Sequence, residues 1–207
     1  RSEESVRKHM LKQILKIGPA LIITAAILWA LDGIIRRSLF TLPPIIIVFY
    51  EHLIGALILI PFIFKDLIKT KFTRKEFLLL VLISLLSGVL GTLWFTTALL
   101  KVNFIPFSVV FLLQKLQPIF AVSTAAIFLK EKFNPRYVLW ASLAFVAAYF
   151  VTFNNGLVNL ETGEGTIVAA LFALGAAAAW GSSTTFSKIA LTKKPPKVVT
   201  GLRLILT

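Results

Sequence analysis

The stretch FIPFSVVFLLQKLQPIFAVSTAAIFL, residues 104–129, is apolar along most of its length and carries a single amine, Lys115. It is longer than the roughly 20 apolar residues that a helix needs to cross the hydrocarbon core of a bilayer. Only a helix or a closed barrel satisfies its own backbone groups in lipid, and a barrel would show strands of alternating polarity. The stretch therefore predicts a transmembrane helix with a buried charge.

The rest of the chain repeats this pattern. Of its 207 residues, 57% are hydrophobic and 15% charged, whereas a soluble domain has about 25% charged residues. Runs that reach or approach spanning length cover residues 19–40, 43–64, 77–100, 104–129, 137–153 and 166–187, and a seventh begins near Val198. We expect an all-α, polytopic membrane helix bundle. The chain begins at Arg1 and ends inside an apolar run, so we expect it to be part of a longer protein.

The basic residues predict the orientation of the spans. The formal charge is +13, and 16 of the 22 Lys and Arg residues lie in segments that would share one side of the membrane. Three lie on the other side, which the positive-inside rule assigns to the exterior. The N-terminus is therefore predicted to be cytoplasmic, in a cytoplasmic membrane. No basic stripe is interleaved with aromatic residues, so the charge does not indicate nucleic-acid binding.

Before the first span, Val6, Met10, Ile14 and Ile17 recur at helical spacing with basic residues between them. This pattern predicts an amphipathic helix over residues 1–18 that lies on the inner membrane surface. Gly18-Pro19 is predicted to end it.

An internal repeat relates the first span to the sixth. Each copy has a Trp, a basic residue eight positions later, a double proline, and a charge seven positions after the second proline. The landmarks are Trp29, Arg37, Pro43-Pro44 and Glu51 in the first copy, and Trp180, Lys188, Pro195-Pro196 and Arg203 in the second. An odd number of spans per copy inverts the second copy relative to the first. Inverted repeats are typical of secondary transporters, whose substrate site lies near the midplane.

These residues resemble the drug/metabolite transporter superfamily, specifically its five-helix EamA-type domain. The resemblance includes TTALL (96–100) and LQPIFAVSTAAIFLKEK (116–132), in which Pro118 precedes Glu131 by thirteen residues. It implies two inverted five-helix repeats with about 6.5 of ten spans present. The division is a first repeat over 19–153, an external loop over 154–165 and a truncated second repeat over 166–207.

Ionisable residues inside the spans are the candidate transport site. Counting about 1.5 Å per residue places Lys115 near the midplane, with Glu51 and Asp32 each roughly 10 Å below the outer surface. Each unpaired charge costs about 2.5–3.5 kcal/mol in a bilayer, so they should face the bundle interior. We expect Lys115 to pair with Glu51. Asp32 is a second partner, is protonated, or is neutralised by Arg36 one turn away. A static tie between helices is the alternative for the Lys115–Glu51 pair.

Polar and aromatic neighbours complete the predicted site. The substrate-binding or proton-coupling residues are Lys115, Glu51, Asp32, Gln114, Gln117, Trp29, Tyr50, Trp94, Trp180 and Arg203. His52 is interpreted as a packing residue and Glu131 as a solvated or loop-bracing charge. The small residues Ser84, Gly88 and Gly91 favour close helix packing.

The predicted function is a secondary transporter that moves a small polar or amphipathic metabolite, amino acid-like or drug-like, by alternating access. A flippase for a lipid-linked precursor and a non-transporting scaffold are the alternatives. An enzyme is not indicated, because the chain has no cysteine, two histidines and no phosphate-cradling glycine loop. No cofactor or metal is implied, since the carboxylates and histidines lack ligand spacing. The expected partners are a small-molecule substrate and the lipid bilayer.

Overall fold

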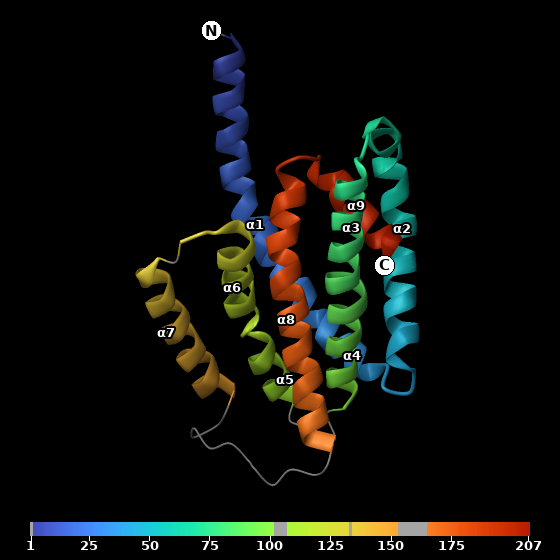
Figure 1. Ribbon diagram of the computed structural model, residues 1–207, viewed down its shortest axis with the longest axis vertical. Helices are drawn as coiled ribbons and strands as arrows, with labels where there is room; N and C mark the ends of the chain where they lie inside the picture. The colour runs from blue at the N-terminus through green and yellow to red at the C-terminus, as the bar shows by residue number, and fades with distance from the viewer. Residues whose placement is uncertain (1, 102–106, 133, 153–164) are drawn as a thin grey trace. The chain divides into compact units, whose positions relative to one another are not determined.

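The computed structural model describes residues 2–101, 107–132, 134–152 and 165–207 (Figure 1). Its elements are α1 (Ser2–Ser38), α2 (Pro44–Lys69), α3 (Arg74–Ile83), η1 (Ser84–Gly91), α4 (Thr92–Leu100), α5 (Phe107–Gln114), α6 (Gln117–Leu129), α7 (Pro135–Thr152), α8 (Gly165–Leu191) and α9 (Pro196–Leu206). The predicted all-α class is confirmed, because the described residues form helices and turns and no strand.

Five helical segments in the described part of the chain are long and apolar enough to cross a membrane. They are Ile17–Ser38, Pro44–Lys69, Arg74–Leu100, Val109–Leu129 and Ile167–Leu191. These segments match five of the six complete spans that the sequence predicts, and α7 covers the remaining one.

The chain divides into two compact units, residues 1–40 and 41–207. The first unit consists mainly of α1, which continues through Gly18 and Pro19, where the sequence predicts a break. Proline removes one backbone hydrogen bond inside a helix. The flanking turns remain helical here, as membrane-type helices often do at proline. The predicted position of residues 1–18 on the membrane surface stays a prediction.

The two double prolines start their helices in the same way. Pro43 (φ −58°, ψ 138°) and Pro195 (φ −58°, ψ 132°) are the N-caps, and α2 and α9 begin at the second proline of each pair. Proline suits this position because its fixed φ is helical and the first turn needs no N–H from it. The local geometry of the two landmarks is therefore the same, as an internal repeat requires.

Helices α2 and α9 pack against each other and run in opposite directions. Gly55 of α2 faces Leu204 of α9, whereas Ile63 of α2 faces Gly201 of α9. A residue nearer the end of α2 therefore contacts a residue nearer the start of α9. The predicted repeat assigns the two helices to corresponding places, and the inversion of its second copy stays a prediction.

Helix α8 lies at the centre of the second unit and packs against α3, η1, α4, α5 and α6. Its buried face is made of alanines, including Ala169, Ala173 and Ala176, which pack against Phe95 of α4 and Val110 of α5. Small residues let helix backbones approach closely where lipid gives no hydrophobic drive for association. Helix α8, which the sequence predicts to open the second repeat, is thus packed among the helices of the predicted first repeat.

One long helix is distorted and another is interrupted. Between α3 and α4, the π-helical segment η1 keeps Arg74–Leu100 continuous. Between α5 and α6, the helix is interrupted by turns at Lys115 and Leu116. Pro118 explains the interruption, because it has no N–H to bond to the carbonyl of Gln114. Lys115, the amine near the predicted midplane, therefore lies at a helix break.

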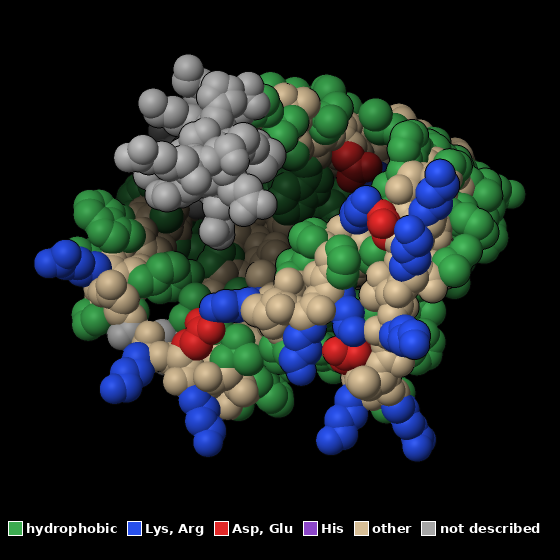
Figure 2. Space-filling model, turned by 90° about the horizontal axis from the view of Figure 1, so that it is seen from above, with side chains coloured by type: hydrophobic (Ala, Val, Ile, Leu, Met, Phe, Trp, Pro, Cys, Tyr) green, Lys and Arg blue, Asp and Glu red, His purple; other side chains and the backbone are tan. Residues whose placement is uncertain are grey.

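The basic connections α2–α3, α6–α7 and α8–α9 lie toward the same end of the second unit (Figure 1). Ion pairs join two of them, Lys194 with Glu76 at 3.1 Å and Lys197 with Asp66. Figure 2 looks onto this end, where Lys and Arg side chains gather with a few acidic ones between them. The shared end is what the predicted orientation requires of these segments.

Candidate functional site

Three predicted site residues lie at the break between α5 and α6. The amide N–H of Lys115 bonds to the carbonyls of Phe111 and Leu112, at 3.1 and 3.0 Å, which closes the last turn of α5. The buried amide of Gln114 donates to Gln117 Oε1 across the break at 3.5 Å. Unwound backbone beside polar side chains is a common feature of transporter substrate sites. Gln114 and Gln117 are therefore in contact across the break, and their role in a transport site stays a prediction.

The predicted ion pair between Lys115 and Glu51 is not among the ion pairs of the described residues. Glu51 lies on α2, which packs against α9 and α4, whereas α5 and α6 pack against α8. Both side chains are exposed within the structure. Counting residues along the sequence gives the two side chains compatible depths, but the main packing partners of their helices differ.

Asp32 is paired within its own helix. Arg36 Nε donates to Asp32 Oδ2 at 2.7 Å, one turn along α1. This is the neutralising partner that the sequence offers as an alternative for Asp32. Trp29 lies on the same helix and is 45% exposed.

Trp94 and Trp180 pack inside the bundle. A Cβ atom placed on Gly175 of α8 would lie 2.9 Å from Trp94 Cε3, so the glycine makes room for this indole. Trp180 Nε1 donates to the carbonyl of Ser87 at 2.8 Å, and its ring lies 5.1 Å from that of Phe95. Ser87 lies in the π-helical segment η1, where the backbone hydrogen bonds are shifted. Its carbonyl accepts the hydrogen bond from the indole N–H of Trp180. Their role as substrate-lining residues stays a prediction.

The two remaining predicted residues lie on helices α2 and α9. Tyr50 is 54% exposed, and its ring meets that of Phe49 edge-on at 5.4 Å. Arg203 is half-buried in α9, and its carbonyl accepts from Ser84 Oγ at 3.3 Å and from Thr207 Oγ1 at 2.7 Å. Within residues 41–207, the structure therefore does not gather the predicted residues of that unit into one cluster.

An apolar groove of about 540 Å³ lies between α2, η1, α4 and α9, and we call it the α2–α9 groove. Its lining is Ile45, Val48, Phe49, His52, Leu53, Ala56, Leu57, Ile60, Val89, Leu93, Leu204, Ile205 and Thr207. His52 Nδ1 lies 2.9 Å from the carbonyl of Val48. A carbonyl only accepts, so Nδ1 carries the proton. The ring is thus held by its own helix, in agreement with a packing role.

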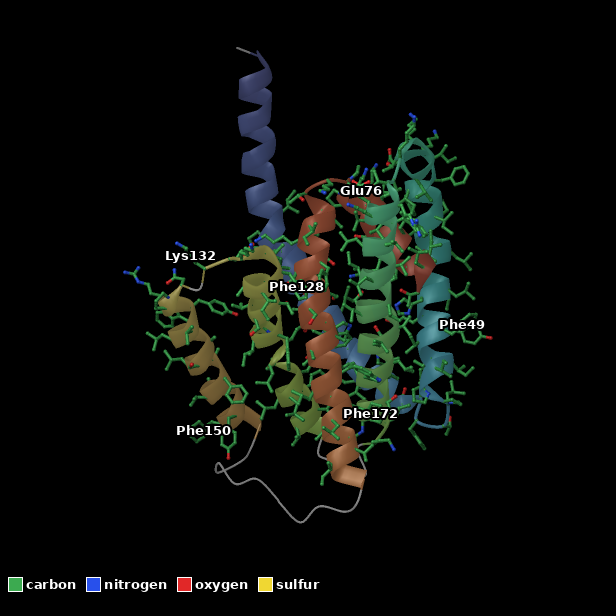
Figure 3. The ribbon with its side chains drawn as sticks, in the orientation of Figure 1. Phe49, Glu76, Phe128, Lys132, Phe150 and Phe172 are labelled. Carbon is green, nitrogen blue, oxygen red and sulfur yellow. The ribbon has the colours of Figure 1, made fainter. Side chains whose placement is uncertain are left out.

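A second hollow of about 360 Å³ lies between α6, the start of α7 and α8, and we call it the α6–α8 hollow. Its lining is Ala121, Val122, Ala125, Glu131, Lys132, Asn134, Tyr137, Thr184, Thr185 and Lys188. Unlike the groove, it combines apolar walls with hydroxyl, amide and charged groups. Figure 3 marks Lys132 in the α6–α7 connection, at the same end of the unit as Glu76.

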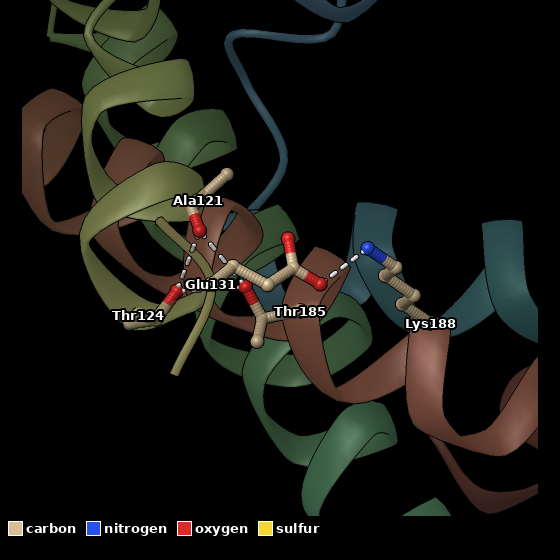
Figure 4. A network of polar contacts seen from close by, with 5 residues as sticks. All are labelled: Ala121, Thr124, Glu131, Thr185 and Lys188. Atoms are coloured by element: carbon tan, nitrogen blue, oxygen red, sulfur yellow. Dashed lines mark hydrogen bonds and ion pairs between the residues drawn. The ribbon is translucent and has the colours of Figure 1, made fainter. Parts of the chain in front are cut away.

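Polar contacts tie α6 to α8 beside this hollow (Figure 4). Thr185 Oγ1 donates to the carbonyl of Ala121 at 2.9 Å and lies 2.9 Å from Thr124 Oγ1. Farther along, Lys188 Nζ is 2.5 Å from Glu131 Oε1, with both side chains about half exposed. An ion pair this exposed contributes little to stability.

Sequence reasoning treats Glu131 as a loop brace and Lys188 as a repeat landmark, and it does not bring them together. The spacing from Pro118 to Glu131 and the basic residue eight positions after Trp180 are the signals that point to this pair. Thr124 and Thr185 carry no such signal, because hydroxyls recur throughout the spans. In the described part of the chain, no three His, Asp or Glu residues gather into a metal site.

Comparison with known proteins decides the family. The model of the EamA-like transporter family matches residues 16–153. The chain belongs to the EamA-like transporter family. The predicted membership and the assignment to transporters rather than enzymes are thereby confirmed. The matched range ends at residue 153, after α7.

This EamA-like chain is similar to the riboflavin transporter ImpX of Fusobacterium nucleatum subsp. nucleatum. The two sequences are 37% identical over 193 residues, which cover 92% of this chain and 64% of the relative. The chain therefore spans just under two-thirds of the relative's length. No solved structure matches the chain.

Proposed function

We propose that the protein is a secondary transporter that moves a riboflavin-like flavin across the membrane by alternating access. The observation that carries this proposal is the 37% identity to a riboflavin transporter along nearly the whole chain. Riboflavin joins a flat, largely apolar ring system to a chain of hydroxyl groups. It therefore belongs to the small amphipathic metabolites that the sequence favours as substrates.

The helix break supports this proposal. Gln114 and Gln117 place amide donors and acceptors where α5 gives way to α6, and neutral amides suit a neutral, hydroxyl-rich substrate. Lys115 at the same break adds an ammonium group that can donate to the hydroxyl oxygens of the substrate. We assign these three residues to the transport path.

The basic connections support an orientation with the N-terminus in the cytoplasm and the protein in a cytoplasmic membrane. With this orientation, the end shown in Figure 2 faces the cytoplasm. The α6–α8 hollow then lies near the cytoplasmic mouth, and the start of α8 lies outside.

Counterflow in proteoliposomes tests the proposal. Vesicles containing the full-length protein and loaded with unlabelled riboflavin should accumulate labelled riboflavin transiently, whereas protein-free vesicles should not. Uptake of an amino acid in place of riboflavin would contradict the flavin assignment. Movement of a lipid-linked precursor would favour the flippase alternative, and no counterflow of any solute would favour a scaffold.

The assigned residues are tested by substitution in the same vesicles. Lys115→Met and Gln114→Leu should each lower riboflavin counterflow at least several-fold while membrane insertion stays intact. Lys69→Met, at the end of α2, is the matched control and should transport normally. Full activity of Lys115→Met would remove the amine from the transport path.

A further inference from the structure

The α6–α8 hollow contains a hydrogen-bonding pattern that the helix break does not use. The carboxylate of Glu131 accepts from the ammonium of Lys188 at 2.5 Å, so an acceptor and a donor lie side by side at the edge of the hollow. Lys132, which follows Glu131 directly, lines the same hollow and adds a second ammonium. The three residues present a carboxylate acceptor together with two ammonium donors.

The backbone before Glu131 is held in a strained conformation. Lys130 has φ 54° and ψ 32°, which is the left-handed region, and it is the only non-glycine residue with positive φ in the part of the chain that the structure describes. A side chain in this region costs about 1 kcal/mol or more, and such residues cluster at functional sites. The turn ends α6 and directs the chain to Glu131, which pairs with α8.

The rest of the hollow suits a flat ring. Its walls combine small apolar side chains of α6, such as Ala121 and Ala125, with the aromatic ring of Tyr137. Its volume of about 360 Å³ falls within the range of small-molecule sites, about 300–1,000 Å³. Aromatic walls and a few placed polar groups at one edge are the usual composition of a site for a heteroaromatic ligand.

We propose that the α6–α8 hollow is a subsite for the pyrimidine edge of the flavin ring, a proposal that rests on the proposed function. That edge carries an imide, an N–H at position 3 between two carbonyl groups. The Glu131 carboxylate accepts from the imide N–H, and the ammonium groups of Lys188 and Lys132 donate to the carbonyls. The subsite thus recognises the ring, while the ribityl hydroxyls remain for other groups on the path.

A methyl group on the imide nitrogen tests this assignment. Binding of riboflavin and of 3-methylriboflavin to the purified full-length protein is measured by quenching of flavin fluorescence. The wild-type protein should bind riboflavin about tenfold more tightly, because a hydrogen bond to a charged group is lost on methylation. Glu131→Ala should weaken riboflavin binding and bring the affinity ratio close to one.

The ratio of the affinities for riboflavin and 3-methylriboflavin distinguishes recognition of the imide by Glu131 from a purely structural role. Glu76→Ala removes another ion pair between a helix and a connection, that with Lys194 at 3.1 Å, and should keep the wild-type ratio. If Glu131→Ala weakens both flavins equally and keeps the ratio, Glu131 only braces α6 against α8 and the proposal is overturned. Equal binding of the two flavins by the wild type would overturn it too, with the transport function intact. Failure to bind riboflavin at all would remove both proposals.

Discussion

The two hollows of the second unit differ in size and in chemistry. The α2–α9 groove is the larger, at about 540 Å³, but His52 and Thr207 are its only polar side chains among the described residues. The α6–α8 hollow has about 360 Å³ and holds an ion pair, two threonines, an asparagine and a tyrosine. A site that must orient an amphipathic substrate needs convergent polar groups as well as space. This difference supports the smaller hollow as the proposed substrate subsite.

The helices around the two hollows are also held differently. Helices α2 and α9 meet through flexible side-chain ends, with Leu204 against Gly55 and Ile63 Cδ1 against Gly201. Helix α8 instead meets the backbone of α6, because a Cβ on Gly181 would lie 2.5 Å from the carbonyl oxygen of Gln117. Flexible side chains tolerate sliding of one helix past another, and backbone contact does not. The α6–α8 contact should therefore respond more strongly to substitution.

The largest expected effect is that of Gly181→Ala. The new methyl group would overlap both Gln117 O and Phe120 Cβ, which lies 2.7 Å from the ideal Cβ position, so α8 must move away from α6. Overpacking of this kind costs about 1–3 kcal/mol, and thermal unfolding in detergent should show the loss. Gly55→Ala is the control, because its Cβ would meet Leu204 at 3.7 Å, an ordinary contact. Equal stability of the two variants would contradict a rigid α6–α8 contact.

Thr185→Val is expected to have the next largest effect. The substitution keeps the shape of the side chain but removes the hydroxyl that donates to Ala121 O at 2.9 Å. Hydrogen bonds between membrane helices contribute about 0.6 kcal/mol on average, so the free energy of unfolding should fall by about that amount. Thr97→Val removes a hydroxyl bonded within its own helix, to Leu93 O at 2.7 Å, and should change stability less. A larger loss of stability in Thr97→Val than in Thr185→Val would indicate that the Thr185 hydroxyl does not tie α6 to α8.

Glu131→Gln should change stability by less than about 0.5 kcal/mol, because half-exposed ion pairs contribute little. The pair with Lys188 is 44% and 61% exposed at its two side chains. Unfolding of the variant and of the wild type, compared at low and high salt, measures this contribution. A loss of several kcal/mol would mean that the pair holds the fold, and it would weaken the case for substrate recognition.

The smallest effect is expected for Gly201→Ala. Its Cβ would lie 2.0 Å from Ile63 Cδ1, but this atom is the end of a flexible side chain that can change rotamer. The rotamer strain of about 0.5–1.5 kcal/mol is offset by the gain of about 0.5–1 kcal/mol when alanine replaces a helical glycine. The melting temperature should therefore stay close to that of the wild type. A loss as large as that of Gly181→Ala would show that α2 and α9 are held as tightly as α6 and α8.

The fold could be predicted from the sequence because apolar length, charge placement and proline position act locally. Both double prolines lie between helices, as the predicted spacers require, and Trp180 and Lys188 lie on one helix. Apart from the pair of Asp32 with Arg36 one turn away, the partners of the buried groups could not be predicted. Counting residues gives the depth of Lys115 and Glu51 but not which helices are neighbours. The π turn that brings the carbonyl of Ser87 to Trp180 has no counterpart in the hydrophobic pattern.

The family resemblance predicted the transporter class but not the polar hollow. Glu131 follows a left-handed residue, Lys130, and it pairs with a lysine 57 positions away in the sequence. A contact over this separation depends on how α6 and α8 pack, which spacing within one helix does not encode.

Cysteine protection tests most directly that the flavin occupies the α6–α8 hollow and not the α2–α9 groove. The sequence contains no cysteine, so a single introduced thiol reports on one place. Thr184→Cys places it in the hollow and Leu57→Cys in the groove, and both positions are exposed in the structure. We expect riboflavin to slow maleimide labelling of Thr184→Cys and to leave that of Leu57→Cys unchanged. Protection of Leu57→Cys without protection of Thr184→Cys would contradict the account.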